Sequence, residues 1–169
     1  MISTPAPSRA SSQTDLPPEV ERLLLSLVDD GFTLYCCRGR HDPTALVASY
    51  QWERYLDLVT IRDFDRITSA RVPKHRDVDV FAPEIVVWAY QGRPEWALRA
   101  LLDLVHPDHP DAPTTCYPAP QSLHVPRHEQ RPLTIRLPSA ARAGARATRL
   151  AAAMMMMRPV RANKGSLLR

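Results

Sequence analysis

The chain has 169 residues, of which 44% are hydrophobic and 24% charged, a composition typical of one globular domain with short extensions. Its 3 cysteines are too few for a disulfide framework, and no apolar run approaches the roughly 20 residues that span a bilayer. The N-terminus shows no basic stretch followed by an apolar one, so we expect a cytoplasmic protein without membrane attachment.

The net charge of +4 comes from the C-terminal part. Residues 21–107 carry 11 Arg and Lys against 13 Asp and Glu, whereas residues 131–169 carry 9 Arg and Lys and no acid. Arginine outnumbers lysine 20 to 2, which the codon usage of a high-GC bacterial genome explains without any function. The slightly acidic body argues against a basic nucleic-acid groove on the folded part.

The chain begins with residues 1–14, which are rich in Ser, Thr, Pro and Ala and predict a disordered leader. A helix is predicted next, ending at Gly31 in the left-handed position that glycine favours. Its apolar residues recur at three- and four-residue spacing and form one stripe: Val20, Leu23, Leu24, Leu27 and Val28.

Runs rich in β-branched and aromatic residues then predict strands at 32–38, 45–52, 55–62, 66–72 and 84–90. Short polar links indicate antiparallel hairpins, and the last run, being the most apolar, is expected at the centre of the sheet. Pro94 is suited to begin a second helix, which His106 and Pro107 end. The fold class is therefore α+β, an antiparallel meander sheet of four to five strands with two helices, spanning residues 15–107.

The remainder is expected to be a largely disordered tail, although residues 122–125 (SLHV) and 132–138 (PLTIRLP) could pair as isolated strands or pack on the edge of the core. Eight of the 17 prolines fall between 107 and 138, so residues 108–138 predict a Pro-rich linker or extended segment. Residues 139–169 form a basic, Ala- and Arg-rich tail that is helical in part, because alanine is the strongest helix former.

Residues 34–42, which read LYCCRGRHD, concentrate reactive side chains. On a strand Cys36 and Cys37 point to opposite faces, so the two thiols cannot coordinate one metal ion. The chain also has no CxxC pair, the usual spacing of cysteine ligands in zinc sites. We favour one buried and one outward thiol over a catalytic or metal role involving His41.

Two weak anion sites are predicted from arginine beside glycine. Arg38, Gly39 and Arg40 form a hairpin tip whose backbone N–H groups lie next to two guanidinium groups. Gly92 and Arg93 lie where the second helix begins, and free N–H groups there attract anions. We favour ordinary solvated turns over anion binding at both places.

Two acidic pairs, Asp63 with Asp65 and Asp77 with Asp79, have the spacing that places carboxylates on one face of a strand. They suggest a weak Mg²⁺ or Mn²⁺ site, although flanking arginines favour solvated strand ends. No cofactor is implied by any motif. The patterns HExxH and Gly-x-Ser-x-Gly are absent from the sequence, so the chain is not expected to be an enzyme.

We therefore expect a small non-catalytic module for protein interaction or regulation, with another protein as its partner. Its interaction face would be the exposed sheet face and edge, including Tyr50, Trp52 and Tyr55 if their rings face solvent. Two alternatives stay open. One is nonspecific, salt-dependent nucleic-acid association through the basic tail. The other is a metal-dependent enzyme without a known motif.

Overall fold

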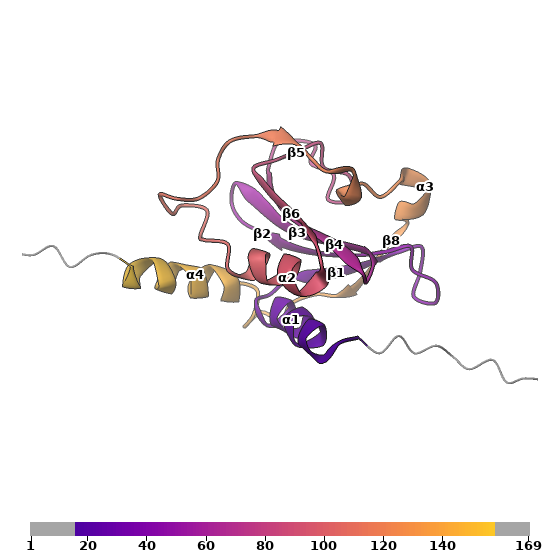
Figure 1. Ribbon diagram of the computed structural model, residues 1–169, viewed down its shortest axis with the longest axis horizontal. Helices are drawn as coiled ribbons and strands as arrows, with labels where there is room; N and C mark the ends of the chain where they lie inside the picture. The colour runs from indigo at the N-terminus through magenta and orange to yellow at the C-terminus, as the bar shows by residue number, and fades with distance from the viewer. Residues whose placement is uncertain (1–15, 158–169) are drawn as a thin grey trace, which may run out of the picture.

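The fold is centred on one six-stranded antiparallel sheet with strand order β6-β4-β3-β2-β1-β8 (Figure 1). The computed structural model describes residues 16–157. The strands of this sheet are β1 (Thr33–Cys37), β2 (Ala45–Gln51), β3 (Tyr55–Asp63), β4 (Arg66–Pro73), β6 (Trp88–Gly92) and β8 (Pro132–Arg136). Strands β6 and β8 are its two edges.

Three helices cover one face of the sheet: α1 (Pro18–Asp29), α2 (Pro94–Leu102) and α4 (Ala145–Met156). The predicted apolar stripe of α1 packs there through Val20, Leu23 and Leu27. The strands contribute Val59, Ile61 and other residues of the same parity, because alternate side chains of a strand share a face.

The second face is covered by two loop segments. They contain β5 (Ile85–Val86) paired with β7 (Tyr117–Pro118), the short helix η1 (Gln121–Leu123) and α3 (Arg127–Gln130). Leu123 packs on Leu56, Leu58 and Val72, and Val125 on Cys37. Both faces of the sheet are therefore buried, which explains why β3 and β4 have few exposed positions.

Gly31 ends α1 as predicted and has a second role. Its φ of 92° is in the left-handed region, where side chains are strained. A Cβ added at Gly31 would lie 2.1 Å from the carbonyl oxygen of Arg142. The glycine therefore lets the segment before α4 cross directly over the end of α1.

The α+β class is confirmed, and two details differ from the sequence prediction. The sheet has six strands because Pro132–Arg136, from the Pro-rich segment, pairs with β1 as an added edge strand. Residues 84–90, expected as the central strand, divide into β5 and the edge strand β6. These residues are apolar although they do not form a central strand, because Val86 and Val87 are buried beneath the segments that cover the sheet.

The described part of the expected tail also differs from a largely disordered chain. It contains β7, η1, α3, β8 and α4, and the N-terminal half of α4 is packed against the core through Leu150. Residues 1–14 and 158–169, expected as leader and end of the tail, lie outside the described residues. No helix within residues 16–157 is long and apolar enough to cross a membrane.

Candidate functional site

A carboxylate, Asp57, is completely buried in the middle of β3 and accepts hydrogen bonds from three side chains. Arg71, its cross-strand neighbour on β4, donates from Nε at 2.7 Å and from Nη2 at 3.0 Å. Trp52 donates from Nε1 at 2.9 Å and Arg146 from Nε at 2.9 Å. A single carboxylate thus joins β3, β4 and α4.

Arg146, also fully buried, extends this network to the end of α1. Its Nη1 lies 3.1 Å from Asp30 Oδ2, and its Nη2 donates to the carbonyl of Leu101 at 2.6 Å. Arg149, one turn further along α4, donates to both carboxylate oxygens of Asp30. These hydrogen bonds from Arg149 to Asp30 raise the pKa of the guanidinium above its ordinary value.

The network fixes where α4 can lie. An unpaired buried charge costs several kcal/mol, so Arg146 has to meet its carboxylates whenever this core forms. The guanidinium of Arg146 also lies over the rings of Phe32 and Trp52, at 5.5 and 6.0 Å from their centroids. Asp57, Arg71 and Arg146 are completely buried, and we assign them a structural role. Asp30 and Arg149, at the outer end of the network, line an open depression beside α1 and α2.

An apolar groove about 320 Å³ in volume opens between α1 and β8 on the helix-covered face. We call it the α1–β8 groove, and its main lining residues are Leu24, Leu25, Val28, Leu46, Phe64 and Ile135. Leu25 is 54% exposed and Ile135 is 38% exposed at its rim. Exposed apolar surface gathered around a concave site is typical of a docking surface.

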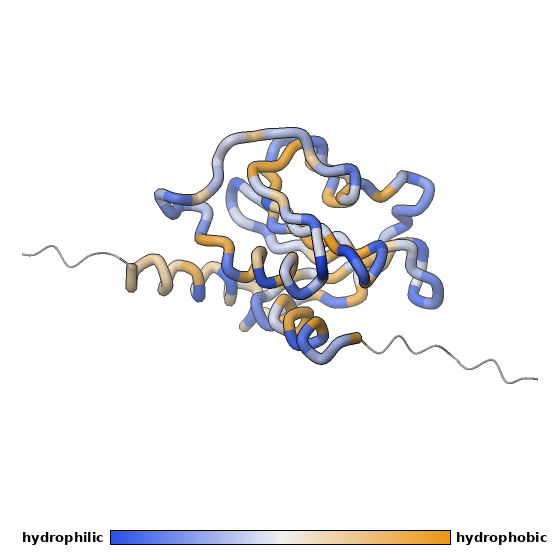
Figure 2. Tube along the Cα trace, in the orientation of Figure 1, coloured by the Kyte–Doolittle hydropathy of each residue, from blue (hydrophilic) through white to orange (hydrophobic). Residues whose placement is uncertain are grey.

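A second surface is formed by the outer turns of α4. Residues 150–157 read LAAAMMMM, and Met155, Met156 and Met157 are 70%, 87% and 75% exposed. Figure 1 shows that this end of the helix points away from the sheet. Figure 2 shows hydrophobic colours at the same end of the helix. An apolar helix end in water is unfavourable unless something covers it.

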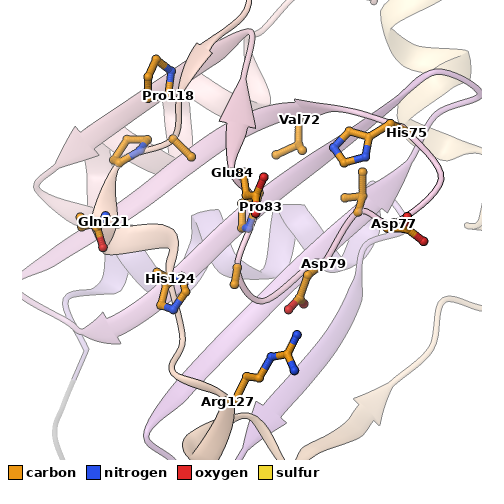
Figure 3. Close-up of a pocket in the computed structure, with 14 residues that line it drawn as sticks. Val72, His75, Asp77, Asp79, Pro83, Glu84, Pro118, Gln121, His124 and Arg127 are labelled. Atoms are coloured by element: carbon orange, nitrogen blue, oxygen red, sulfur yellow. The ribbon is translucent and has the colours of Figure 1, made fainter.

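A larger cavity, of about 680 Å³, lies between the two loop segments on the second sheet face (Figure 3). We call it the loop cavity, and its polar lining includes His75, Asp77, Asp79, Glu84, His124 and Arg127. Arg127 extends toward the carboxylate of Asp79, which accepts a hydrogen bond from the backbone N–H of Phe81 at 2.9 Å. Its apolar floor includes Val72 and Pro83.

The walls of the loop cavity are tied to each other by the backbone. The N–H of Ala119 donates to the carbonyl of Glu84 at 2.9 Å, and that of Val125 to Phe81 at 2.7 Å. Arg62 also binds the carbonyl of His124, at 3.1 Å. The cavity is therefore preformed, as ligand sites usually are.

The predicted metal residues divide between two places. Asp77 and Asp79 line the loop cavity, whereas Asp63 and Asp65 form the β3–β4 turn, where Asp63 Oδ1 accepts the N–H of Asp65 at 3.0 Å. Within residues 16–157, no group of three or more His, Cys, Asp or Glu side chains is arranged to hold a metal ion.

The predicted anion residues also lie apart. Arg38, Gly39 and Arg40 form the β1–β2 tip, where Arg38 and Gly39 both have positive φ. Gly92 ends β6, and Arg93 immediately precedes α2. Nη2 of Arg93 lies 2.6 Å from Oε1 of Glu95. Since β2, β3 and β4 separate β1 from β6, the two groups do not converge on one site.

The predicted aromatic interaction face is not an exposed surface. Tyr50 and Trp52 are buried in the helix-covered core, where their ring centroids lie 5.0 Å apart, and Tyr55 is half-buried beside them. All three side chains point to the sheet face that α2 and α4 cover, so Tyr50 and Trp52 have no exposed ring to offer a partner. Of the predicted interaction surface, the sheet edge at β8 remains accessible.

The expectation of one buried and one outward strand thiol is wrong, because helices cover one face of the sheet and loops the other, and both cysteines are therefore protected. Both are buried, and Cys36 donates from Sγ to the carbonyl of Gly39 at 2.9 Å. Burial raises the pKa of the Cys37 thiol above its ordinary value, which disfavours the reactive thiolate. Cys116 is exposed.

Comparison with known proteins identifies no relative: no family model matches the chain, and no curated protein or solved structure matches it.

Proposed function

We propose that the protein is a non-catalytic interaction module that binds another protein chain in the α1–β8 groove. The observation that carries this proposal is the groove itself, a concave and almost wholly apolar surface with exposed Leu25 and Ile135 at its rim. Grooves of this kind accept the apolar side chains of a partner helix, which gain free energy on leaving water.

The groove is a better docking site than the sheet faces. Helices cover one face of the sheet and loops the other, so a partner meets little sheet surface. The β8 edge is short, begins with Pro132 and is soon followed by Pro138, which limits pairing with a further strand. Side-chain insertion into the groove, rather than strand addition, is the mode that these features favour.

The test places a photo-crosslinking amino acid at Leu25 and, as the matched control, at Trp96, which is equally exposed but lies on α2. Irradiation in the cells that produce the protein is expected to give one discrete protein adduct from position 25 and none from position 96. The adduct should disappear when Ile135→Lys is added. No adduct at position 25, or equal adducts at both positions, contradicts the proposal.

A second candidate function is the binding of a small polar molecule in the loop cavity. The supporting observation is its volume of about 680 Å³, which is within the range of ligand pockets, together with its converging charged groups. The test follows the NMR chemical shifts of the lining residues during titration with spermidine, a cation, and with citrate, an anion. If neither probe moves these shifts, or if Glu84→Gln leaves the affinity of a bound probe unchanged, this candidate is rejected.

Nucleic-acid association through the tail remains a third proposal, with less support. Arg142, Arg146 and Arg149 each lie within 3.1 Å of an aspartate oxygen, so their charge is engaged within the chain. Removing residues 158–169 alone is the appropriate test, because a cut at 131 would also remove β8 and α4. Salt-dependent DNA binding that this truncation abolishes would support the proposal, and its absence in the full chain would reject it.

A further inference from the structure

The chain carries both a groove for apolar side chains and an apolar element that needs covering. The element is the outer part of α4, where Met155, Met156 and Met157 are among the most exposed large hydrophobic residues described. Methionine is unbranched and flexible, so it adapts to the shape of an apolar groove. Residues 150–157 contain no charge that would oppose burial.

The methionines cannot enter the groove of their own chain while α4 stays docked. Arg146 and Leu150 hold the N-terminal half of the helix at the end of α1 and α2. Twelve helical residues extend over about 18 Å, and Figure 1 shows that this length leads away from α1 and the sheet. A cis arrangement would require the buried ion pairs of Arg146 to break.

The sequence that follows the methionines and the body of the chain have net charges of opposite sign. The methionines are followed in the sequence by Arg158, Arg161, Lys164 and Arg169, with no acid. Residues 21–107, which form most of the groove, have an excess of two acids, and the groove lining itself contains one acid, Glu21, and one base, Arg136. The attraction between these net charges would favour the approach of two chains, and the apolar lining of the groove would then hold the methionines.

We propose that the occupant of the α1–β8 groove is the methionine end of α4 from a second copy of this chain. This inference rests on the proposed function of the groove and names its partner. Since the helix end and the groove are different surfaces, the contact is heterologous, and repetition gives a ring or an open chain rather than a symmetric dimer. The assembly therefore depends on protein concentration.

Sedimentation velocity of the full chain over a wide concentration range tests this directly. We expect the sedimentation coefficient of the wild type to rise with concentration. The helix-end variant carries Met155→Lys and Met156→Lys, which make the outer end of α4 charged. The groove variant carries Leu25→Lys and Ile135→Lys, which place charges at the rim of the groove. Each variant alone should remain monomeric at all concentrations, while Trp96→Lys should assemble like the wild type.

Mixing the two variants is the decisive step. The helix-end variant keeps an intact groove and the groove variant keeps an intact helix end, so an equimolar mixture should form a one-to-one dimer and nothing larger. Failure to recover this dimer, or a wild type that stays monomeric, overturns the inference. Ile135→Lys alone serves as the groove variant if the double substitution does not fold.

The outcome also separates this inference from the proposed function. A monomeric wild type whose position 25 still crosslinks to a different protein overturns the second-copy assignment and leaves the groove as a docking site. A monomeric chain that gives no crosslink at position 25 removes both.

Discussion

The Nε of Arg146 donates a hydrogen bond to Asp57 Oδ2 over 2.9 Å, although 89 positions separate the two residues in the chain. Both side chains are completely buried. This contact makes a helix from the basic C-terminal segment an integral part of the α+β fold. It also sets the direction in which the methionine end of α4 leaves the body.

Replacing Arg146 should destabilise the protein far more than replacing its neighbour Arg142. Arg146→Met removes a buried partner of both Asp57 and Asp30, and we expect a loss of about 3 kcal/mol in the free energy of unfolding. Arg142→Met breaks an exposed pair with Asp29 and should cost less than about 1 kcal/mol. Urea unfolding measures both, and equal effects contradict the buried role of Arg146.

Gly31→Ala tests whether the chain before α4 crosses the end of α1 closely. Gly39 is the matched control, because its φ of 104° is equally unfavourable for alanine but an added Cβ meets open space. Gly39→Ala should therefore cost only the backbone strain, about 1–2 kcal/mol. Gly31→Ala should cost clearly more, since the carbonyl of Arg142 has to move. Equal losses in urea unfolding would place residue 142 elsewhere.

Lowering the pH should remove the contribution that Glu19 makes to the free energy of unfolding. Hydrogen bonds from Arg22 and then Arg99 lower the pKa of this carboxyl to about 2. The pKa of Glu19 is lower in the folded chain than its value of about 4.5 in the unfolded chain. Ionised Glu19 therefore stabilises the folded state above pH 4.5, and this stabilisation is lost as the pH falls toward 2. The difference in urea midpoint between wild type and Glu19→Gln should shrink over that range. A difference that stays constant down to pH 2 contradicts this assignment.

The cysteines should divide into one reactive and two protected thiols. Cys116 is exposed, whereas Cys36 and Cys37 are buried and burial raises the pKa of Cys37. Mass spectrometry after brief iodoacetamide treatment should show one adduct on the native chain and three in denaturant. The native adduct should vanish in Cys116→Ser. Fast native labelling at Cys37 would contradict its burial.

The local pattern of the sequence predicted the parts of the fold that depend on neighbours in the chain. The stripe of α1, the glycine that ends it and the hairpins from β1 to β4 follow from periodicity and turn residues. The addition of β8 to β1 joins segments about 100 residues apart, which no local pattern reveals. The buried aromatic residues were misplaced for the same reason, since α2 and α4 cover them.

The ion network was missed, although the sequence contains a hint of it. Asp57 interrupts the apolar run YLDLV, and Arg71 lies between Ala70 and Val72 in β4, so each is a charge on a strand that is largely buried. Such charges require partners. Asp57 and Arg71 are partners of each other, and the second arginine bound to Asp57, Arg146, lies in an Ala- and Arg-rich stretch. The composition of that stretch alone could not distinguish a buried arginine from a solvated one.

The Arg146–Asp57 pair builds α4 into the fold, and a double-mutant cycle on the free energy of unfolding measures how strongly the two side chains interact. Asp57→Asn, Arg146→Met and the double variant are compared with the wild type. We expect a coupling energy of about 1–3 kcal/mol, because the two side chains share one buried network. Additivity of the two single substitutions within about 0.5 kcal/mol would show that the contact does not form, and would contradict the claim.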